Sequence, residues 1–173
     1  RVSAGVEELV RQPWTKNRRG FQEQANVYWR VRMEHAQRSR SGEEQRPFEE
    51  AVREDMRILL GGMAIRMRRE VAPDLTAAIQ FEVSGKQPGQ WYLDLREGTC
   101  TLKEGKADLP ALTIRTPSEV WAAIALGRMD GGQALREKKY TAEGDLGLLL
   151  RFKSLFDRGE KRPGGKETNR EGG

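Results

Sequence analysis

The chain has 173 residues, of which 36% are apolar and 33% are charged, and its formal net charge is +5. This is the size of a single domain, whose core must come from a few concentrated apolar segments because so many residues are charged. No apolar run reaches the roughly 20 residues that span a bilayer, and no signal peptide opens the sequence, so we expect a cytoplasmic protein without stable membrane insertion. A single cysteine, Cys100, excludes an internal disulfide and a cysteine-based metal site, and we expect it to be a small buried residue.

The positive charge lies mainly near the N-terminus. Residues 1–46 hold ten Lys and Arg against six Asp and Glu, whereas residues 70–156 are almost neutral. We therefore interpret the basic balance as a solvated surface and expect no nucleic-acid partner. Residues 1–46 are predicted to be a basic linker with a helical extension, because residues 21–38 show helical spacing without Gly or Pro. Residues 157–173 hold no apolar residue and are expected to be a disordered tail.

Residues 47–67 predict the first core helix. Pro47 suits the first turn of a helix, and apolar residues then recur at steps of three and four up to Met67. Gly61 and Gly62 interrupt this stripe. They indicate the close approach of another backbone or of a ligand, with a simple kink as the alternative.

After the first helix the apolar period changes from helical to alternating. Residues 79–83 and 91–95 alternate apolar with polar side chains and are separated by turn residues, which predicts an antiparallel hairpin. Two further strands, around residues 99–103 and 112–116, complete a predicted meander. Because one face of each strand is polar, helices are expected on only the other face of the sheet.

The remaining elements are short helices and a fifth strand. Thr116–Glu119 has the pattern of a capping box and predicts a helix, Asp130 begins a shorter helix, and residues 138–143 are predicted to be a strand. Gly144-Asp145 caps a last helix over residues 146–156, whose apolar surface is wider than one sheet contact requires. Its width leaves three alternatives open, which are plain core packing, a bound apolar ligand and a second copy of the chain.

Two stretches near the C-terminus carry a more specific signal. Ala125–Ala134 reads ALGRMDGGQA, and Lys138–Gly147 reads KKYTAEGDLG. They resemble the closing signature of sterol carrier protein type 2 domains, in which a helix leads through a Gly-Lys-Met or Gly-Lys-Leu turn to an alanine helix, a strand, and a Gly-Asp turn into the final helix. The resemblance covers residues 47–156, and the family's order of elements agrees with the order predicted from the periodicities.

The resemblance implies an α+β fold, with a twisted, five-stranded, mainly antiparallel sheet, helices packed on one face, and an elongated apolar cavity between them. In that family the cavity holds fatty acyl chains, acyl-CoA or sterols, so the implied function is non-catalytic binding or carriage of a lipid, without a cofactor. Each buried methylene contributes about 0.8 kcal/mol, so few polar contacts are needed. The residues that map onto the cavity lining are Met56, Leu59, Leu60, Met63, Phe81, Trp91, Leu93, Trp121, Ile124, Leu146, Leu149, Leu150 and Phe152.

We expect no catalytic residues and no metal site in this domain. It lacks a Gly-x-Gly-x-x-Gly motif and a phosphate-binding loop, and the single histidine, His35, lies outside residues 47–156. Asp94 and Glu82, on one face of the hairpin, are interpreted as solvated carboxylates rather than a catalytic dyad. The resemblance also extends to C-terminal modules of larger bacterial proteins, including flavodoxin-like NAD(P)H-dependent reductases. The alternative function is therefore an accessory module that presents a substrate to a fused or partner enzyme, or mediates homodimerisation.

Overall fold

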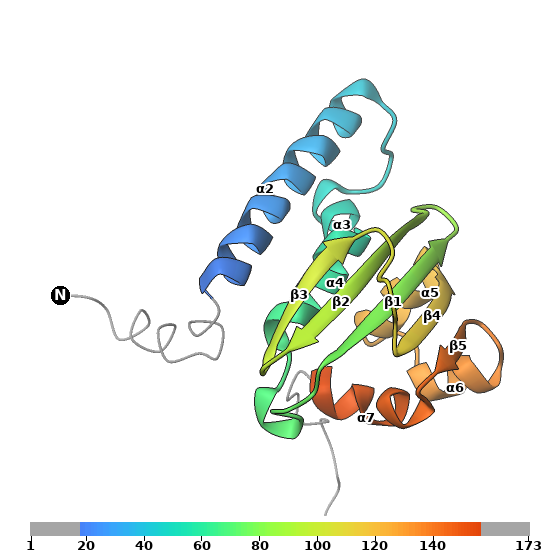
Figure 1. Cartoon of the computed structure of the whole chain (residues 1–173). Coiled ribbons are helices and arrows are strands. Elements are labelled where there is room, and N and C mark those ends of the chain that lie inside the picture. The colour runs from blue at the N-terminus through green and yellow to red at the C-terminus, as the bar shows by residue number, and fades with distance from the viewer. Residues whose placement is uncertain (1–17, 157–173) are drawn as a thin grey trace, which may run out of the picture.

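The computed structural model describes residues 18–156 (Figure 1). The predictions of a linker at the start of the chain and of a disordered tail fall on residues 1–17 and 157–173 and lie outside the described residues. The elements in chain order are α2 (Arg18–Ser41), α3 (Phe48–Arg53), α4 (Met56–Arg66), the 3₁₀ helix η2 (Arg69–Val71), β1 (Ala77–Ser84), β2 (Gly89–Arg96), β3 (Thr99–Glu104), β4 (Leu112–Pro117), α5 (Ser118–Ala125), α6 (Gly131–Arg136), β5 (Thr141–Gly144) and α7 (Leu146–Phe156).

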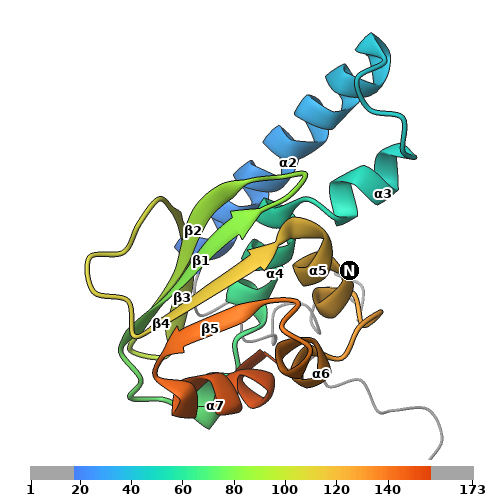
Figure 2. The same ribbon diagram turned by 90° about the vertical axis from the view of Figure 1, so that its right-hand side faces the viewer.

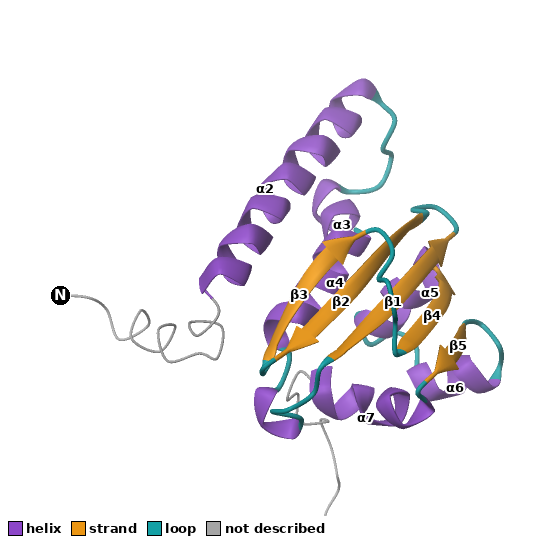
Figure 3. Cartoon of the chain, viewed as in Figure 1, coloured by secondary structure: helices purple, strands orange, loops and turns teal. Residues whose placement is uncertain are grey.

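The five strands form one mixed sheet in the order β3-β2-β1-β4-β5 (Figure 3). β1 pairs with β2, β2 with β3, and β4 with β5, all antiparallel, so the predicted hairpin and the mainly antiparallel α+β fold are confirmed. β4, however, runs parallel to β1. The predicted four-stranded meander is therefore wrong, because after β3 the chain crosses to the opposite side of β1.

A buried glutamine on the outer face of the sheet holds this crossover. Gln80 is only 3% exposed; its Nε2 donates to the carbonyl oxygens of Trp91 and Gly105, both at 3.0 Å, and its Oε1 accepts from the backbone N–H of Ala107 at 2.8 Å. The loop from β3 to β4 passes in front of β1 in Figure 1, and its residues Gly105 and Ala107 make these hydrogen bonds with Gln80. Gln80 thus attaches the crossing loop to the polar face of the sheet. The loop covers the Gln80 amide, and its backbone replaces the hydrogen bonds that water would make with that amide.

Helices α4, α5 and α7 pack on the face of the sheet opposite that loop (Figure 2). The inward side chains of the strands are those that the alternation predicts, and Ile79, Phe81, Leu93, Leu112 and Ile114 have no exposed surface. Helix α2 forms a further layer, because its main contacts are with α3 and α4. The core therefore lies between the sheet and three helices, with α4 enclosed on both sides.

The predicted helix over residues 47–67 is in fact two helices. α3 begins after Pro47, whereas α4 begins after Asp55, whose Oδ1 accepts a hydrogen bond from the backbone N–H of Arg57 at 3.0 Å. Aspartate is favoured at such a capping position because its carboxylate satisfies a free N–H group of the first turn. The apolar stripe did not reveal this break, since its steps of three and four residues continue from Val52 in α3 to Met56 and Leu59 in α4.

Gly61 marks the point where α2 approaches α4. A Cβ atom placed on Gly61 would overlap the side chain of Gln24, whose Nε2 donates to the carbonyl oxygen of Arg57 at 3.2 Å. The predicted close approach therefore occurs at this glycine, although the neighbour is a side chain of α2 rather than a backbone or a ligand. A Cβ atom placed on Gly62 would lie 3.4 Å from Nη2 of Arg66, so this position has more room.

The capping box predicted at Thr116–Glu119 does not form. The N-cap of α5 is Pro117, which makes no side-chain capping bond. The Oγ of Ser118 instead accepts from the backbone N–H of Gln87 at 3.1 Å, and Glu119 accepts from that of Lys86 at 2.7 Å. Both side chains thus bond the backbone of the turn between β1 and β2 instead of the first turn of α5, and they fix α5 to the hairpin.

Candidate functional site

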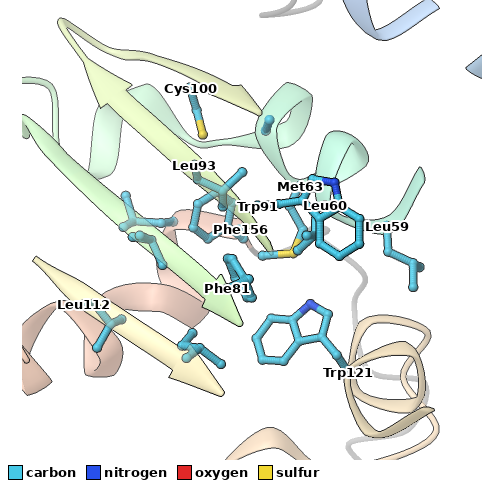
Figure 4. Packing of buried hydrophobic residues seen from close by; sticks show 14 of the residues in the cluster. Leu59, Leu60, Met63, Phe81, Trp91, Leu93, Cys100, Leu112, Trp121 and Phe156 are labelled. Carbon is cyan, nitrogen blue, oxygen red and sulfur yellow. The ribbon is translucent and has the colours of Figure 1, made fainter. Parts of the chain in front are cut away.

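The candidate site is the apolar interior between the sheet and the helices (Figure 4). Met56, Leu59, Leu60 and Met63 come from α4, Phe81, Trp91 and Leu93 come from the strands, Trp121 comes from α5, and all eight are buried in one cluster. Three more of the residues mapped onto the lining, Ile124, Leu149 and Phe152, are partly buried and pack against it. The structure thus brings together residues from four parts of the sequence. Because apolar residues alternate with polar ones in the strands and recur every three or four positions in α4, this grouping was accessible from the sequence.

Leu146 and Leu150 are not part of this cluster. They are 57% and 83% exposed and lie on the solvent side of α7. The opposite side of the helix supplies Leu148, Leu155 and Phe156, which are buried and which sequence reasoning missed. The cap at Asp145, whose Oδ1 accepts from the backbone N–H of Leu148 at 3.0 Å, fixes the start of the helix as predicted. Residues 146–150 are nearly all apolar, so this segment alone does not indicate which residues face inward. The helical spacing of residues 148, 152 and 155 would have indicated the buried side.

Trp121 is the centre of an aromatic group within this interior. Its ring makes edge contacts with Phe81, Tyr140 and Phe152, with centroids 5.0, 5.9 and 5.9 Å away. The ring of Phe152 in turn lies 4.7 Å from that of Phe156. Such edge contacts favour one orientation of each ring beyond the gain from burial. They join β1, α5 and α7 at the site.

The indole N–H of Trp121 is a polar group inside this apolar interior. The side chain is 4% exposed, and no acceptor for Nε1 is found among residues 18–156. Figure 4 shows the nitrogen edge of the ring turned toward the middle of the labelled cluster. Buried N–H groups of proteins are normally hydrogen-bonded, so this one is unusual.

A second buried polar group joins α2 to α4. His35 is 4% exposed, and its Nε2 lies 2.9 Å from Oδ2 of Asp55, which is 3% exposed. Arg57 donates to both carboxylate oxygens, at 3.0 Å from Nε and 2.9 Å from Nη2, and also pairs with Glu34 at 2.8 Å. Sequence reasoning placed His35 outside the domain and missed this contact, because nothing local signals a partner 20 residues away. No group of three or more potential metal ligands occurs in the described part of the chain.

Two carboxylates near this contact make stability depend on pH. The hydrogen bond from Arg46 lowers the pKa of Glu44 to about 2, from an ordinary value of 4.5. Burial alone would raise the pKa of Asp55, but hydrogen bonds from Arg57, His35 and Gln87 outweigh it and hold this pKa below its ordinary value of 3.8. Each carboxylate therefore binds its proton more weakly in the folded chain than in the unfolded one. Their stabilisation is present above the ordinary values and is lost as the pH falls through the folded ones.

We expect the urea midpoint of unfolding to change little between neutral pH and about pH 5, and to fall steadily from about pH 4.5 toward pH 2. The Glu44→Gln variant should show a shallower fall over this range, because the substituted side chain does not titrate. Urea titrations followed by circular dichroism at several pH values measure both. An equally steep fall in Glu44→Gln would contradict the assignment of this dependence to Glu44.

The other candidate reactive groups are accounted for by their surroundings. Asp94 and Glu82 do not face one another, since Asp94 is opposite Ala78 and Glu82 is opposite Gln90. Asp94 pairs with Arg96 and Lys103, and Glu82 pairs with Arg115. The Cys100 thiol is buried as expected, and burial raises its pKa. A thiol of this kind is inert.

The fold and its interior define the class of protein as an α+β domain in which helices cover an apolar sheet face. The SCP-2 sterol transfer family matches residues 66–157, more than half of the sequence. The chain therefore belongs to this family. Helices α2 and α3 and nearly all of α4 precede the matched segment. Among the helices of residues 18–156, none has both the length and the apolar character needed to cross a bilayer.

Solved structures share the fold at low sequence identity. Palmitated SCP2L2 from Aedes aegypti has a TM-score of 0.51 and 18% identity, over 60% of this chain and 96% of that one. The sec-alkylsulfatase Pisa1 from Pseudomonas sp. has a TM-score of 0.52 and 21% identity, over 62% of this chain. The match spans only 17% of the sulfatase chain, so the same fold is one part of a much larger enzyme there.

Proposed function

We propose that this domain binds a lipid with a long hydrocarbon chain between the sheet and helices α4, α5 and α7, and carries it without chemical change. The observation that carries the proposal is the continuous buried apolar cluster joining the sheet to these helices, in a chain that belongs to the SCP-2 sterol transfer family. The palmitated state of the similar SCP2L2 structure supports a fatty acyl chain as ligand. Acyl-CoA and sterol-like lipids are the other ligands implied, and we propose a cytoplasmic location.

Entry of a lipid requires the packed side chains to move apart. Met56, Met63 and Met67 line one side of the cluster, and methionine side chains adapt readily because they are unbranched. Helix α7 forms another side and has solvent on its outer surface at Leu146 and Leu150. Each methylene that the lipid buries contributes about 0.8 kcal/mol, which offsets the displaced side-chain contacts. We propose residues 47–156 as the lipid-binding domain, with α2 of the 1–46 extension packed against it.

Displacement of a fluorescent fatty acid tests this function. The whole chain is titrated with cis-parinaric acid, which is then displaced by palmitate, palmitoyl-CoA or cholesterol. Met63→Phe, which enlarges a buried side chain, should weaken binding roughly 4- to 15-fold, equivalent to displacing one or two methylenes. Met33→Phe is the matched control, because Met33 is 72% exposed on α2, and it should bind like the wild type.

Binding by neither the wild type nor the control would contradict the proposal. Equal binding by Met63→Phe and Met33→Phe would place the ligand outside the cluster. Circular dichroism of both variants shows whether a loss of binding reflects loss of the fold.

An accessory role in a larger enzyme is the second candidate. The observation that favours it is the fold shared with part of a sec-alkylsulfatase. In this role the domain would present an apolar substrate to an enzyme, such as a flavodoxin-like NAD(P)H-dependent reductase, or hold two copies together. The mass of the natural protein, detected with an antibody against residues 47–156, tests the first of these roles, and sedimentation of the chain tests the second. A natural protein no larger than this domain that also sediments as a monomer would contradict both.

A further inference from the structure

The indole nitrogen of Trp121 is not needed for the packing of its ring. Phe81, Tyr140 and Phe152 hold the ring through edge contacts that a phenyl ring could also make. A buried donor without an acceptor has lost its hydrogen bond to water and gained none in return. The N–H therefore destabilises the folded chain alone, and it becomes favourable only when an acceptor from another molecule reaches it. A ligand in the apolar interior is in the right place to do so.

The chemistry of this donor restricts the acceptor. An indole N–H is a single uncharged donor. A hydroxyl, ester or ketone oxygen pairs with it well, whereas an ionised carboxylate buried beside it would also need a cation. The buried polar or charged residues of the described chain are His35, Asp55, Gln80, Thr116 and Ser118, and they include no Lys or Arg.

The buried polar residues are also engaged elsewhere. Gln80 holds the loop on the outer face of the sheet, and His35 pairs with Asp55 between α2 and α4. The hydroxyl of Thr116 donates to the carbonyl oxygen of Pro117, and Ser118 bonds the β1–β2 turn. None of them supplies a positive charge to the interior around Trp121.

We infer that the site prefers an uncharged lipid, a long-chain alcohol or ester, whose oxygen accepts a hydrogen bond from Nε1 of Trp121. This inference rests on the proposed function and names the ligand class of the same site. A fatty acid would enter tail first, keep its carboxylate in water, and make no use of this nitrogen. Sensitivity to the loss of the indole N–H therefore distinguishes the two ligand classes.

The test compares ligands of equal chain length on the wild type, Trp121→Phe and Trp29→Phe. Dodecanol, dodecane and dodecanoate are each measured by displacement of cis-parinaric acid. Trp121→Phe should weaken dodecanol binding about 2- to 10-fold, the value of one hydrogen bond, and leave dodecane and dodecanoate unchanged. Trp29→Phe is the control, because Trp29 is 62% exposed on α2 and should change nothing.

The negative results of this test separate failure of the inference from failure of lipid binding itself. If the wild type binds all three ligands and Trp121→Phe weakens them equally, or weakens dodecanoate most, the inference is wrong while lipid binding stands. If the wild type binds none of them, both proposals fail.

A second measurement follows the wild-type chain itself and uses the variant only to assign one signal. In the ¹⁵N-labelled wild type, the indole N–H signal of Trp121, assigned by its absence in Trp121→Phe, should shift downfield when dodecanol is added and should not do so with dodecane. The same response to both ligands would overturn the inference.

Discussion

Replacing Asp55 by alanine is expected to lower the free energy of unfolding by about 3–5 kcal/mol. The carboxylate is almost fully buried and receives hydrogen bonds from His35, from two nitrogens of the Arg57 guanidinium and from the first turn of α4. Its removal leaves the other groups without their partner and removes the cap of the helix. Urea denaturation followed by circular dichroism measures the change.

Asp94→Ala is the matched control for this substitution. Asp94 also pairs with an arginine two residues further on and with a second basic side chain, but both partners lie at the surface. Asp94→Ala should lower the free energy of unfolding by only about 0–1 kcal/mol, because solvent screens exposed ion pairs. Similar losses for Asp55→Ala and Asp94→Ala would show that the contact between α2 and α4 contributes little to stability.

Phe81→Ala is expected to lower the free energy of unfolding by about 3–5 kcal/mol. Phe81 has no exposed surface, and its ring packs on that of Trp121 at 5.0 Å, so truncation leaves a space where sheet and helices meet. Thermal and urea unfolding measure the loss. Phe21→Ala, which truncates a ring that is 40% exposed on α2, is the control and should cost about 1 kcal/mol or less.

The Phe81→Ala variant also reports on the ligand. A lipid that binds only the folded chain stabilises it by about 2.7 kcal/mol at 100 times its dissociation constant. Dodecanol at this level should therefore restore much of the stability that Phe81→Ala loses, and should also stabilise the wild type. No stabilisation of either protein at any soluble concentration of dodecanol would contradict a lipid site in this interior.

Periodicity predicted the inward faces of the strands because each strand alternates its side chains across the sheet whatever the strand order. It did not predict the position of β4. That position depends on a loop crossing the sheet over Gln80, and the pairing of an amide with a distant backbone leaves no local pattern. The capping box at Thr116–Glu119 failed for a related reason, because its side chains bond the β1–β2 turn, more than 30 residues earlier in the chain.

The candidate site was predicted best where one face of an element is apolar and the other polar. Strands β1 and β2 meet this condition, and their inward residues Phe81, Trp91 and Leu93 are buried. Helix α7 begins with apolar residues on several sides, so Leu146 and Leu150 were assigned to the interior although they face solvent. The unpaired N–H of Trp121 emerges only from three-dimensional contacts, because it depends on which acceptors lie near the ring.

Native mass spectrometry tests lipid binding by this domain most directly. The 173-residue chain is incubated in turn with dodecanol, palmitate, palmitoyl-CoA and cholesterol, and the mass of the folded species is recorded. We expect a one-to-one complex with at least one of these ligands, at a lower occupancy in Met63→Phe than in Met33→Phe. A folded protein that forms no complex with any of the four would contradict it.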